Sequence, residues 1–443
     1  MTTTNTSTTP SPTTDFNPTS FLHILPHILL PILLILAYFP PPFRGRAPLF
    51  LALLAIVQWQ CTTSPWPPNA GDTRALRYGL NSSWIFALPV VERMVMHTPE
   101  KDFFRVVDDD DSDKVKKGKS QLVREWSCGK LWRAVRLVCT PRAVGWNFGS
   151  RMINDQRKEM RRRRLAKERQ LQRGQFAVRS LVRAFACYLA WDLVMLAEKK
   201  VVTIPDAESW RWGWSREALG EMAKVELIML ATVYLGMNLW FETAAAIGSG
   251  LGLNQPEEWP PLFGSLFDCY TTANVWGKFW HQYLRQPCLG FSRRLVELLH
   301  VPRRSTLAYL IHLTNAFLIS TFFHVLSVGT VAGGYYPLRS LISDMSIFFM
   351  LQPVGAMIEG AVMALFARYV WAPKGKGGPE GTTRRSRIAE VVIPSVCQGV
   401  GYVWVVCWFF VTSFWFVKGY AGVGTQNWKL PYSIMERVLV CGN

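Results

Sequence analysis

The stretch 307–328, LAYLIHLTNAFLISTFFHVLSV, decides the fold of this chain. It carries no Asp, Glu, Lys or Arg, and it has the roughly 20 residues that a helix needs to cross a bilayer. Other long apolar runs occur at Phe21–Phe39, Leu49–Trp59, Val225–Trp240, Ile342–Val370 and Val391–Val417. So many long apolar runs are hard to explain as buried helices of a soluble protein. The sequence therefore predicts an all-α, polytopic membrane bundle.

The charge distribution predicts how these helices are oriented. The formal net charge is +18, and the interval from Glu100 to Gln175 holds 21 Lys and Arg against 11 Asp and Glu. Basic connecting segments of membrane proteins lie on the cytoplasmic side, near anionic lipid. Eight spans, within a range of seven to nine, place every basic segment on that side. The predicted spans are 21–39, 48–61, 78–96, 176–197, 222–241, 307–329, 341–370 and 391–417, and the basic segments are 43–47, 97–175, 251–304 and 371–389.

Four regions follow from this pattern. Residues 1–19 form a disordered Thr/Ser/Pro tail, which has no Lys or Arg and is therefore not the start of a signal peptide. Residues 20–96 form N-terminal transmembrane helices, of which 78–96 is the weakest candidate because it contains Glu92 and Arg93. Residues 97–175 form a basic cytoplasmic loop with an amphipathic helix that has Leu131, Trp132, Val135 and Val138 on one face. Residues 176–443 form the membrane core.

The segment WGKFWHQYLR, Trp276–Arg285, is dense in aromatic and polar side chains. Its aromatic rings suit a membrane interface, and its cations can extend from there to water. That interpretation does not account for His281 and Gln282. If the segment is helical, one face carries polar residues at i, i+3, i+4 and i+7. These residues are Lys278, His281, Gln282 and Arg285, and such a stripe fits the mouth of a tunnel that receives a polyanionic donor.

His324 is the second candidate, because it lies deep in an apolar run with no ionised neighbour. A polar residue inside a membrane faces a cavity or the bundle interior, so it is a functional candidate by default, with an interhelical hydrogen bond as the alternative. His312, on the same run, points to a different face. Asn238, Glu242 and Glu359 are expected to make packing hydrogen bonds first, and to line a pocket second. The nine cysteines are scattered without a CxxC pair, so we expect no metal site.

The order of several motifs resembles the fungal wax-synthase-like branch of the membrane-bound O-acyltransferases. Trp259–Gly264 (WPPLFG) fits the lead-in of that branch, and Trp276, Trp280, His281, Gln282 and Arg285 fit its Trp-His-Gln signature. Ser320 and His324 match a Ser-Gly-x-x-His helix, with Thr321 in place of Gly. Gln352 and Glu359 match a later helix, and Arg142–Trp146 is similar to an Arg-Gly-Ile-Gly-Trp segment. The resemblance extends from about Arg142 to Glu359.

The resemblance implies an O-acyltransferase of the terpenoid or meroterpenoid acetyltransferase branch, which acts in secondary metabolism. Its co-substrate would be acyl-CoA, most directly acetyl-CoA, with an apolar alcohol as acceptor and no tightly bound cofactor. His324 would be the general base, because an alcohol must lose its proton as it attacks a thioester. His281 with Gln282 would orient the thioester or stabilise the oxyanion. The remaining expected substrate contacts are Lys278, Arg285, Trp276, Trp280, Ser320 and Glu359.

Two other interpretations remain open from the sequence. A long-chain wax or sterol ester synthase would share the fold and differ in the length of the acyl chain. A membrane transporter would use buried His and Glu as proton relays, and it would show internal repeats, of which none is evident. The endoplasmic reticulum is the expected membrane, no nucleic-acid partner is expected, and the sequence leaves the oligomeric state open.

Overall fold

The structure is a computed structural model that describes residues 18–63, 78–79, 82–106, 126–166, 173–201, 214–332, 336–369, 385–423 and 432–440. Most of the predicted disordered tail, the charge run around 108–121 and the basic segment 371–384 lie outside these residues. Within them the fold is all-α, as predicted. The only pairing of β type there is an isolated bridge between Arg105 and Trp146.

Five of the described helices are long and apolar enough to cross a membrane. They correspond to the fourth to eighth predicted spans, because each contains a long, mainly apolar run. These helices are α9 (Arg173–Val201), α10 (Arg216–Gly250), α13 (Thr306–Ala332), α14 (Leu338–Tyr369) and α15 (Arg385–Gly422).

The N-terminal helices do not meet the same criterion. Helix α1 (Pro18–Leu36) has a shorter apolar part, Ile24–Leu36, and helix α2 (Arg46–Thr63) buries Arg46 and Gln58. Helix α4 (Trp84–Met96) has 13 residues, or about 20 Å, which is shorter than the ~30 Å hydrocarbon core. The count of eight spans and the sidedness of the loops therefore stay predictions.

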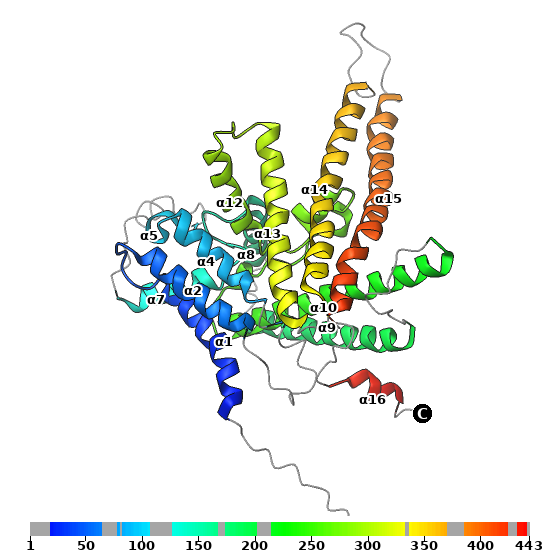
Figure 1. Ribbon diagram of the computed structural model, residues 1–443. Helices are drawn as coiled ribbons and strands as arrows, with labels where there is room; N and C mark the ends of the chain where they lie inside the picture. Colours follow the sequence, from blue (N-terminus) through cyan, green and yellow to red (C-terminus); the bar gives the residue numbers. More distant parts are fainter. Residues whose placement is uncertain are drawn as a thin grey trace, which may run out of the picture.

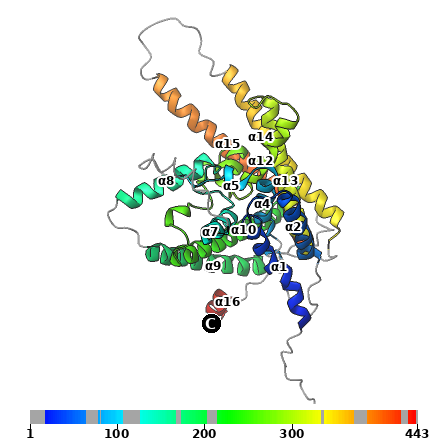
Figure 2. The ribbon, with the colours of Figure 1, turned by 90° about the vertical axis from the view of Figure 1, so that its left-hand side faces the viewer.

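Helices α13, α14 and α15 lie side by side, and α9 and α10 run together across their lower end in both views (Figures 1 and 2). Helices α14 and α15 approach closely at Gly355. A Cβ atom at that position would lie 2.7 Å from the indole nitrogen of Trp408. Small residues allow such close approach between helices in a membrane. Helix α12 (Arg285–Leu298) packs against α13 on the other side.

A second group of helices surrounds α4 and lies beside this bundle (Figure 1). Glu92 and Arg93 of α4 are fully buried, and Arg93 donates to the carbonyl of Leu137, 2.7 Å away. The group consists of α1, α2, α4, α5 (Pro99–Asp102) and α7 (Cys128–Val138). Both charged residues of α4 thus face protein rather than lipid.

The amphipathic helix predicted in the basic loop is present as α7. Ala134, Leu137 and Val138 pack into the N-terminal core, whereas Leu131 and Trp132 are exposed. The apolar positions of α7 fall on two sides, and the side with the smaller residues fits against α1 and α4. After α7, the chain continues into α8 (Arg151–Ala166), and at its far end α16 (Ile434–Val440) packs on α9.

Candidate active site

The segment with the Trp-His-Gln signature is not one helix, so the predicted polar stripe is wrong. Its first part is the π-helix Val275–Phe279, labelled η4, in which the Trp280 N–H donates to the Val275 carbonyl, 2.7 Å away. Trp280 itself has extended backbone (φ −65°, ψ 148°), and helix α12 begins only at Arg285. A π-turn inside a helical region is frequent at functional sites. Lys278 and Arg285 therefore lie on different elements from His281.

The lead-in Trp259–Gly264 is what imposes this break. The Gly264 N–H donates to the carbonyl of Phe279 at 2.9 Å, which fixes the end of the π-helix. A Cβ atom at Gly264 would lie 2.3 Å from the carbonyl oxygen of Lys278, so only glycine permits the contact. The two motifs that are adjacent in sequence are thus one folded unit. The short elements η2 (Pro256–Glu258), η3 (Leu266–Asp268) and α11 (Thr272–Asn274) complete this unit.

The side chain of Gln282 is buried within the turn and hydrogen-bonds to its backbone, so it does not line a tunnel. Its side chain is 4% exposed, and its Nε2 donates to the carbonyls of Trp276 at 3.2 Å and Trp280 at 2.7 Å. Its Oε1 accepts from Arg285 at 2.9 Å, and the same Arg285 nitrogen donates to the Gly277 carbonyl. Both ends of the amide are therefore occupied by protein. Gln282 holds the backbone that positions His281.

Trp276 lies inside the bundle, so the membrane-interface interpretation is wrong for this residue. Its Nε1 donates to Oε1 of Gln352, 3.2 Å away on α14, and the Gln352 amide in turn donates to Thr412 of α15. Its ring also meets aromatic rings from three spanning helices. These rings belong to Phe317, Phe348 and Phe409, at centroid distances of 5.4, 6.3 and 5.8 Å. Trp280 packs beside it, 5.9 Å away.

Glu359 anchors the segment from α14. It is 7% exposed and accepts hydrogen bonds from the backbone N–H and the hydroxyl of Thr272 and from the Ala273 N–H. The indole of Trp404 on α15 donates to the same carboxylate at 2.8 Å. A carboxylate at the first turn of a helix satisfies N–H groups that have no partner within the helix. The packing role was the first expectation for Glu359, and the geometry supports it over substrate contact.

His281 is enclosed by aromatic rings next to the turn. Its imidazole lies 5.4 Å from the ring of Trp280, 5.3 Å from that of Tyr283 and 6.5 Å from that of Phe263. Burial, with smaller contributions from the charges of His324 and Arg142, lowers the pKa of His281 to about 3. The imidazole is therefore neutral at physiological pH. Its Nδ1 is buried and has no hydrogen-bond partner among the described residues.

His281 and His324 are 43 positions apart in the chain but border one continuous set of aromatic rings. Trp276 and Phe348, whose rings contact each other, connect the neighbour of His281 to the neighbour of His324. The Nδ1 of His324 is 2.8 Å from the carbonyl of Ser320, one turn earlier on α13. Phe323, Phe349 and Phe416 surround its ring at 5.0, 4.5 and 6.0 Å. Ser320 thus contacts His324 through its backbone carbonyl. The structure places both histidines that the sequence singled out in one aromatic setting.

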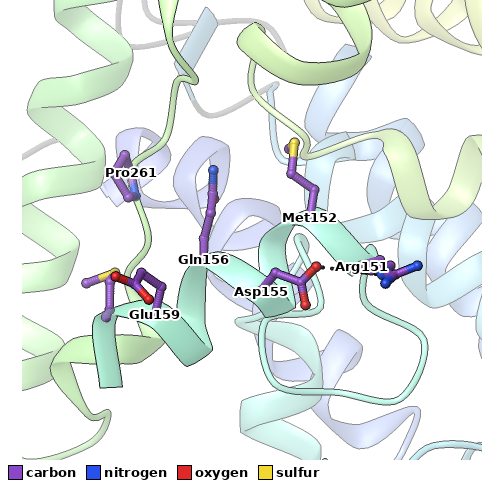
Figure 3. Close-up of a pocket in the computed structure, with 7 residues that line it drawn as sticks. Arg151, Met152, Asp155, Gln156, Glu159 and Pro261 are labelled. Atoms are coloured by element: carbon purple, nitrogen blue, oxygen red, sulfur yellow. Dashed lines mark ion pairs between the residues drawn. The ribbon is translucent and has the colours of Figure 1, made fainter. Parts of the chain in front are cut away.

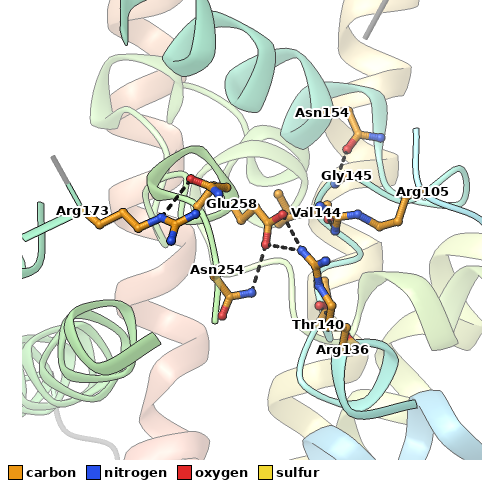
Figure 4. A network of polar contacts seen from close by, with 10 residues as sticks. Arg105, Arg136, Thr140, Val144, Gly145, Asn154, Arg173, Asn254 and Glu258 are labelled. Atoms are coloured by element: carbon orange, nitrogen blue, oxygen red, sulfur yellow. Dashed lines mark hydrogen bonds and ion pairs between the residues drawn. The ribbon is translucent and has the colours of Figure 1, made fainter. Parts of the chain in front are cut away.

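An ion-pair network around Glu258 holds the start of the lead-in (Figure 4). The sequence did not predict this network. Glu258 accepts from Arg105, from Arg136 at 2.7 Å and from Asn254 at 2.9 Å. Burial tends to raise the pKa of Glu258, but the positive charges of Arg105 and Arg136 outweigh it and lower the pKa below its usual value. The carboxylate thus ties the basic loop to the lead-in. Sequence motifs do not reveal it because the two arginine partners lie more than 100 residues away.

A shallow surface hollow of about 740 Å³ lies between α8 and Pro261 (Figure 3). Arg151, Asp155 and Glu159 on its rim place charges of both signs around it. None of the residues predicted for the site from the sequence lines this hollow, so the candidate site is the aromatic region around His281 and His324 instead.

Residues 259–351, which include both histidines and the π-turn, match the model of the membrane bound O-acyl transferase family. The match covers this segment, which is less than half of the chain. Among curated proteins the chain is 32% identical over 188 residues to acetyltransferase spyB of Aspergillus fumigatus, covering 42% of this chain and 30% of that protein. It is 31% identical over 220 residues to acetyltransferase atnC of an Arthrinium species, covering 48% and 43%.

A further relative of this chain is matched over more of its length. Acetyltransferase ataH of Aspergillus terreus is 29% identical over 254 residues, which cover 53% of this chain and 77% of that protein. The matches to spyB and atnC span less than half of those relatives. No solved structure matches the chain.

Proposed function

We propose that this chain transfers an acetyl group from acetyl-CoA to a hydroxyl of an apolar natural product, such as a terpenoid or meroterpenoid. The observation that carries the proposal is that His281 and His324 border one set of aromatic rings within the segment that matches the family. The names of the relatives support acetyl as the transferred group. Five apolar helices support a membrane setting in which an apolar alcohol is soluble.

The proposed reaction passes through a complex of enzyme, alcohol and thioester, without a covalent enzyme intermediate. The unprotonated Nε2 of His324 takes the hydroxyl proton while the alcohol oxygen bonds to the thioester carbonyl carbon. Negative charge develops on the carbonyl oxygen, and the neutral imidazole of His281 donates a hydrogen bond to it. The C–S bond then breaks, and the CoA sulfur leaves with the proton. Ester and free CoA are the products.

In this scheme Lys278 and Arg285 lie at the exposed side of the turn, where the CoA phosphates would contact them. In the same scheme, the rings of Trp276 and Trp280 form one side of the site. Gln282 and Glu359 hold the segment that carries these rings, and the carbonyl of Ser320 holds the ring of His324. The endoplasmic reticulum membrane, with the turn on its cytoplasmic side, gives access to soluble acyl-CoA.

The test is CoA release from acetyl-CoA by microsomes that contain the protein, offered a panel of terpenoid alcohols. Microsomes without the protein give the background, and acyl-CoA donors of increasing chain length define the acyl group. We expect acetyl-CoA to give the highest rate and the product to be the acetate ester. Preference for long-chain acyl-CoA would replace the proposal by a wax or sterol ester synthase. Solute flux in vesicles without CoA release from any donor would replace it by a transporter.

A further inference from the structure

Arg142 is a buried cation at the base of the candidate site. Its side chain is 6% exposed, and its two terminal nitrogens donate to consecutive carbonyls of the lead-in, Pro260 and Pro261, each at 2.8 Å. A guanidinium is the side chain best shaped for two such bonds at once, because its donors form a rigid fork. These two prolines precede the residues that contact the π-turn. Arg142 therefore fixes the lead-in whose Gly264 sets the position of His281.

No carboxylate among the described residues forms an ion pair with Arg142. Its Nε–H is buried and has no hydrogen-bond partner in the same part of the chain, and the face of the Phe241 ring lies 5.7 Å from the guanidinium carbon. The nearby Arg105 and Arg136 differ, because both are paired with Glu258. A buried charge without a counter-ion is costly. The two carbonyl hydrogen bonds and the face of the Phe241 ring offset part of that cost.

The field of this charge reaches His281. The charged and titratable groups that face His281 are Arg142, His324 of α13 and the neighbouring Tyr283. Burial raises the pKa of Tyr283 to about 12, so Tyr283 stays neutral and does not offset the cation. Burial also lowers the pKa of Arg142 to about 10, so it keeps its proton at physiological pH. Arg142 is thus the fixed positive charge that opposes protonation of His281.

We propose that Arg142 is a positioning residue of this site, which fixes the lead-in through two carbonyls and adds an unpaired positive charge to the surroundings of His281. A neutral imidazole retains one N–H for the thioester oxygen and one free lone pair. The part of this inference that concerns the thioester rests on the proposed function. The part that concerns the protonation state of His281 stands on the structure alone.

The decisive experiment measures deuterium exchange at the imidazole C2 position of each histidine by mass spectrometry, on purified protein in detergent over a pH series. The exchange midpoint reports the pKa of each histidine without any need for activity. We expect His281 to titrate well below the ordinary pH 6.5. Arg142→Lys keeps the charge and should leave the midpoint unchanged. Arg142→Gln should raise it by about one pH unit, since one nearby charge shifts a pKa by that order.

Arg183→Gln is the matched control, because it removes a cation that pairs with Glu242 outside the site. Should Arg142→Gln fail to fold, Phe241→Glu places a counter-ion beside the guanidinium and leaves both carbonyl bonds intact. That variant should raise the His281 midpoint, whereas Phe241→Gln should not. An unchanged His281 midpoint in folded Arg142→Gln, or in Phe241→Glu, overturns the proposal.

Acyl transfer gives a separate readout. If the proposed function holds, the low-pH loss of activity moves to higher pH in Arg142→Gln, by the same amount as the His281 midpoint. Arg142→Lys should keep the wild-type pH profile but turn over more slowly, because an ammonium cannot hold both carbonyls with the geometry of a guanidinium. An absence of acyl transfer in the wild-type protein overturns the proposed function and leaves the exchange result to decide the role of Arg142.

Discussion

The Nδ1 atom of His324 lies 2.8 Å from the carbonyl oxygen of Ser320, one turn earlier on the same helix. A carbonyl only accepts hydrogen bonds, so Nδ1 must carry the hydrogen of the neutral ring. The lone pair is then on Nε2, at the opposite edge of the imidazole. The helix backbone itself therefore fixes the tautomer that a general base needs, without a carboxylate partner.

Replacement of His324 tests this role directly. We expect His324→Ala to lower kcat by about 10²- to 10⁴-fold, which is the usual contribution of a positioned base. His324→Gln should lose as much, because an amide can accept a hydrogen bond but does not hold a proton at neutral pH. His312→Ala, on another face of the same helix, is the control and should keep its activity. Full turnover by His324→Ala would remove His324 as the base.

Glu359 should matter for stability rather than for substrate binding. Glu359→Gln removes the charge that satisfies the N–H groups of Thr272 and Ala273, at a cost of about 2 kcal/mol in the free energy of unfolding. Glu242→Gln is the control, since its partner Arg183 is half exposed and the pair contributes about 0.5 kcal/mol. Thermal unfolding in detergent gives the comparison. An unchanged unfolding temperature together with a raised KM for acyl-CoA would assign Glu359 to substrate contact instead.

The helical framework was predictable because its signal is local. A long, mainly apolar run such as 307–328 has few alternatives to a spanning helix, and α9, α10, α13, α14 and α15 each follow from such a run. Helix α4 was less predictable, since Glu92 and Arg93 are buried by α7 and α12. A hydropathy pattern cannot tell protein burial from lipid contact.

The candidate site was predictable in its residues but not in its geometry. His281 and His324 stand out as polar groups in aromatic or apolar surroundings, and the fold places both beside one set of aromatic rings. The turn that presents His281 depends on the contact between Gly264 and Lys278. This contact joins two segments of the loop, so it produces no periodic pattern in the sequence. Arg142 was not assigned a role, because one more arginine in a basic segment looks solvated until its burial is known.

Lys278 lies on the exposed side of the π-turn and forms no ion pair within the described residues. Lys278→Gln should raise the KM for acyl-CoA about threefold at low ionic strength and leave kcat unchanged, since an exposed charge contact contributes up to about 1 kcal/mol. The difference should shrink at 0.5 M salt by roughly the extent that screening predicts. Lys101→Gln, an exposed lysine on α5, is the control. A KM that is independent of salt in both proteins would exclude a phosphate contact.

Gly264 is the residue on which the shape of the turn depends most. Because a Cβ atom would lie 2.3 Å from the Lys278 carbonyl, Gly264→Ala must displace either the lead-in or the π-turn, and both are backbone. We expect at least tenfold loss of kcat/KM, since a displacement of about 1 Å at positioning groups can reduce rates by roughly 10²-fold.

Gly220→Ala is the matched control for Gly264→Ala, because a Cβ atom at Gly220 of α10 meets no atom within 4 Å. That change should stabilise the helix by about 0.8 kcal/mol and leave kcat/KM unaltered. The His281 exchange midpoint distinguishes displacement from general unfolding. In folded Gly264→Ala it should move toward pH 6.5, because a displaced turn exposes the imidazole to water. Wild-type activity in Gly264→Ala would mean that the turn tolerates displacement and that His281 does not depend on it for its position.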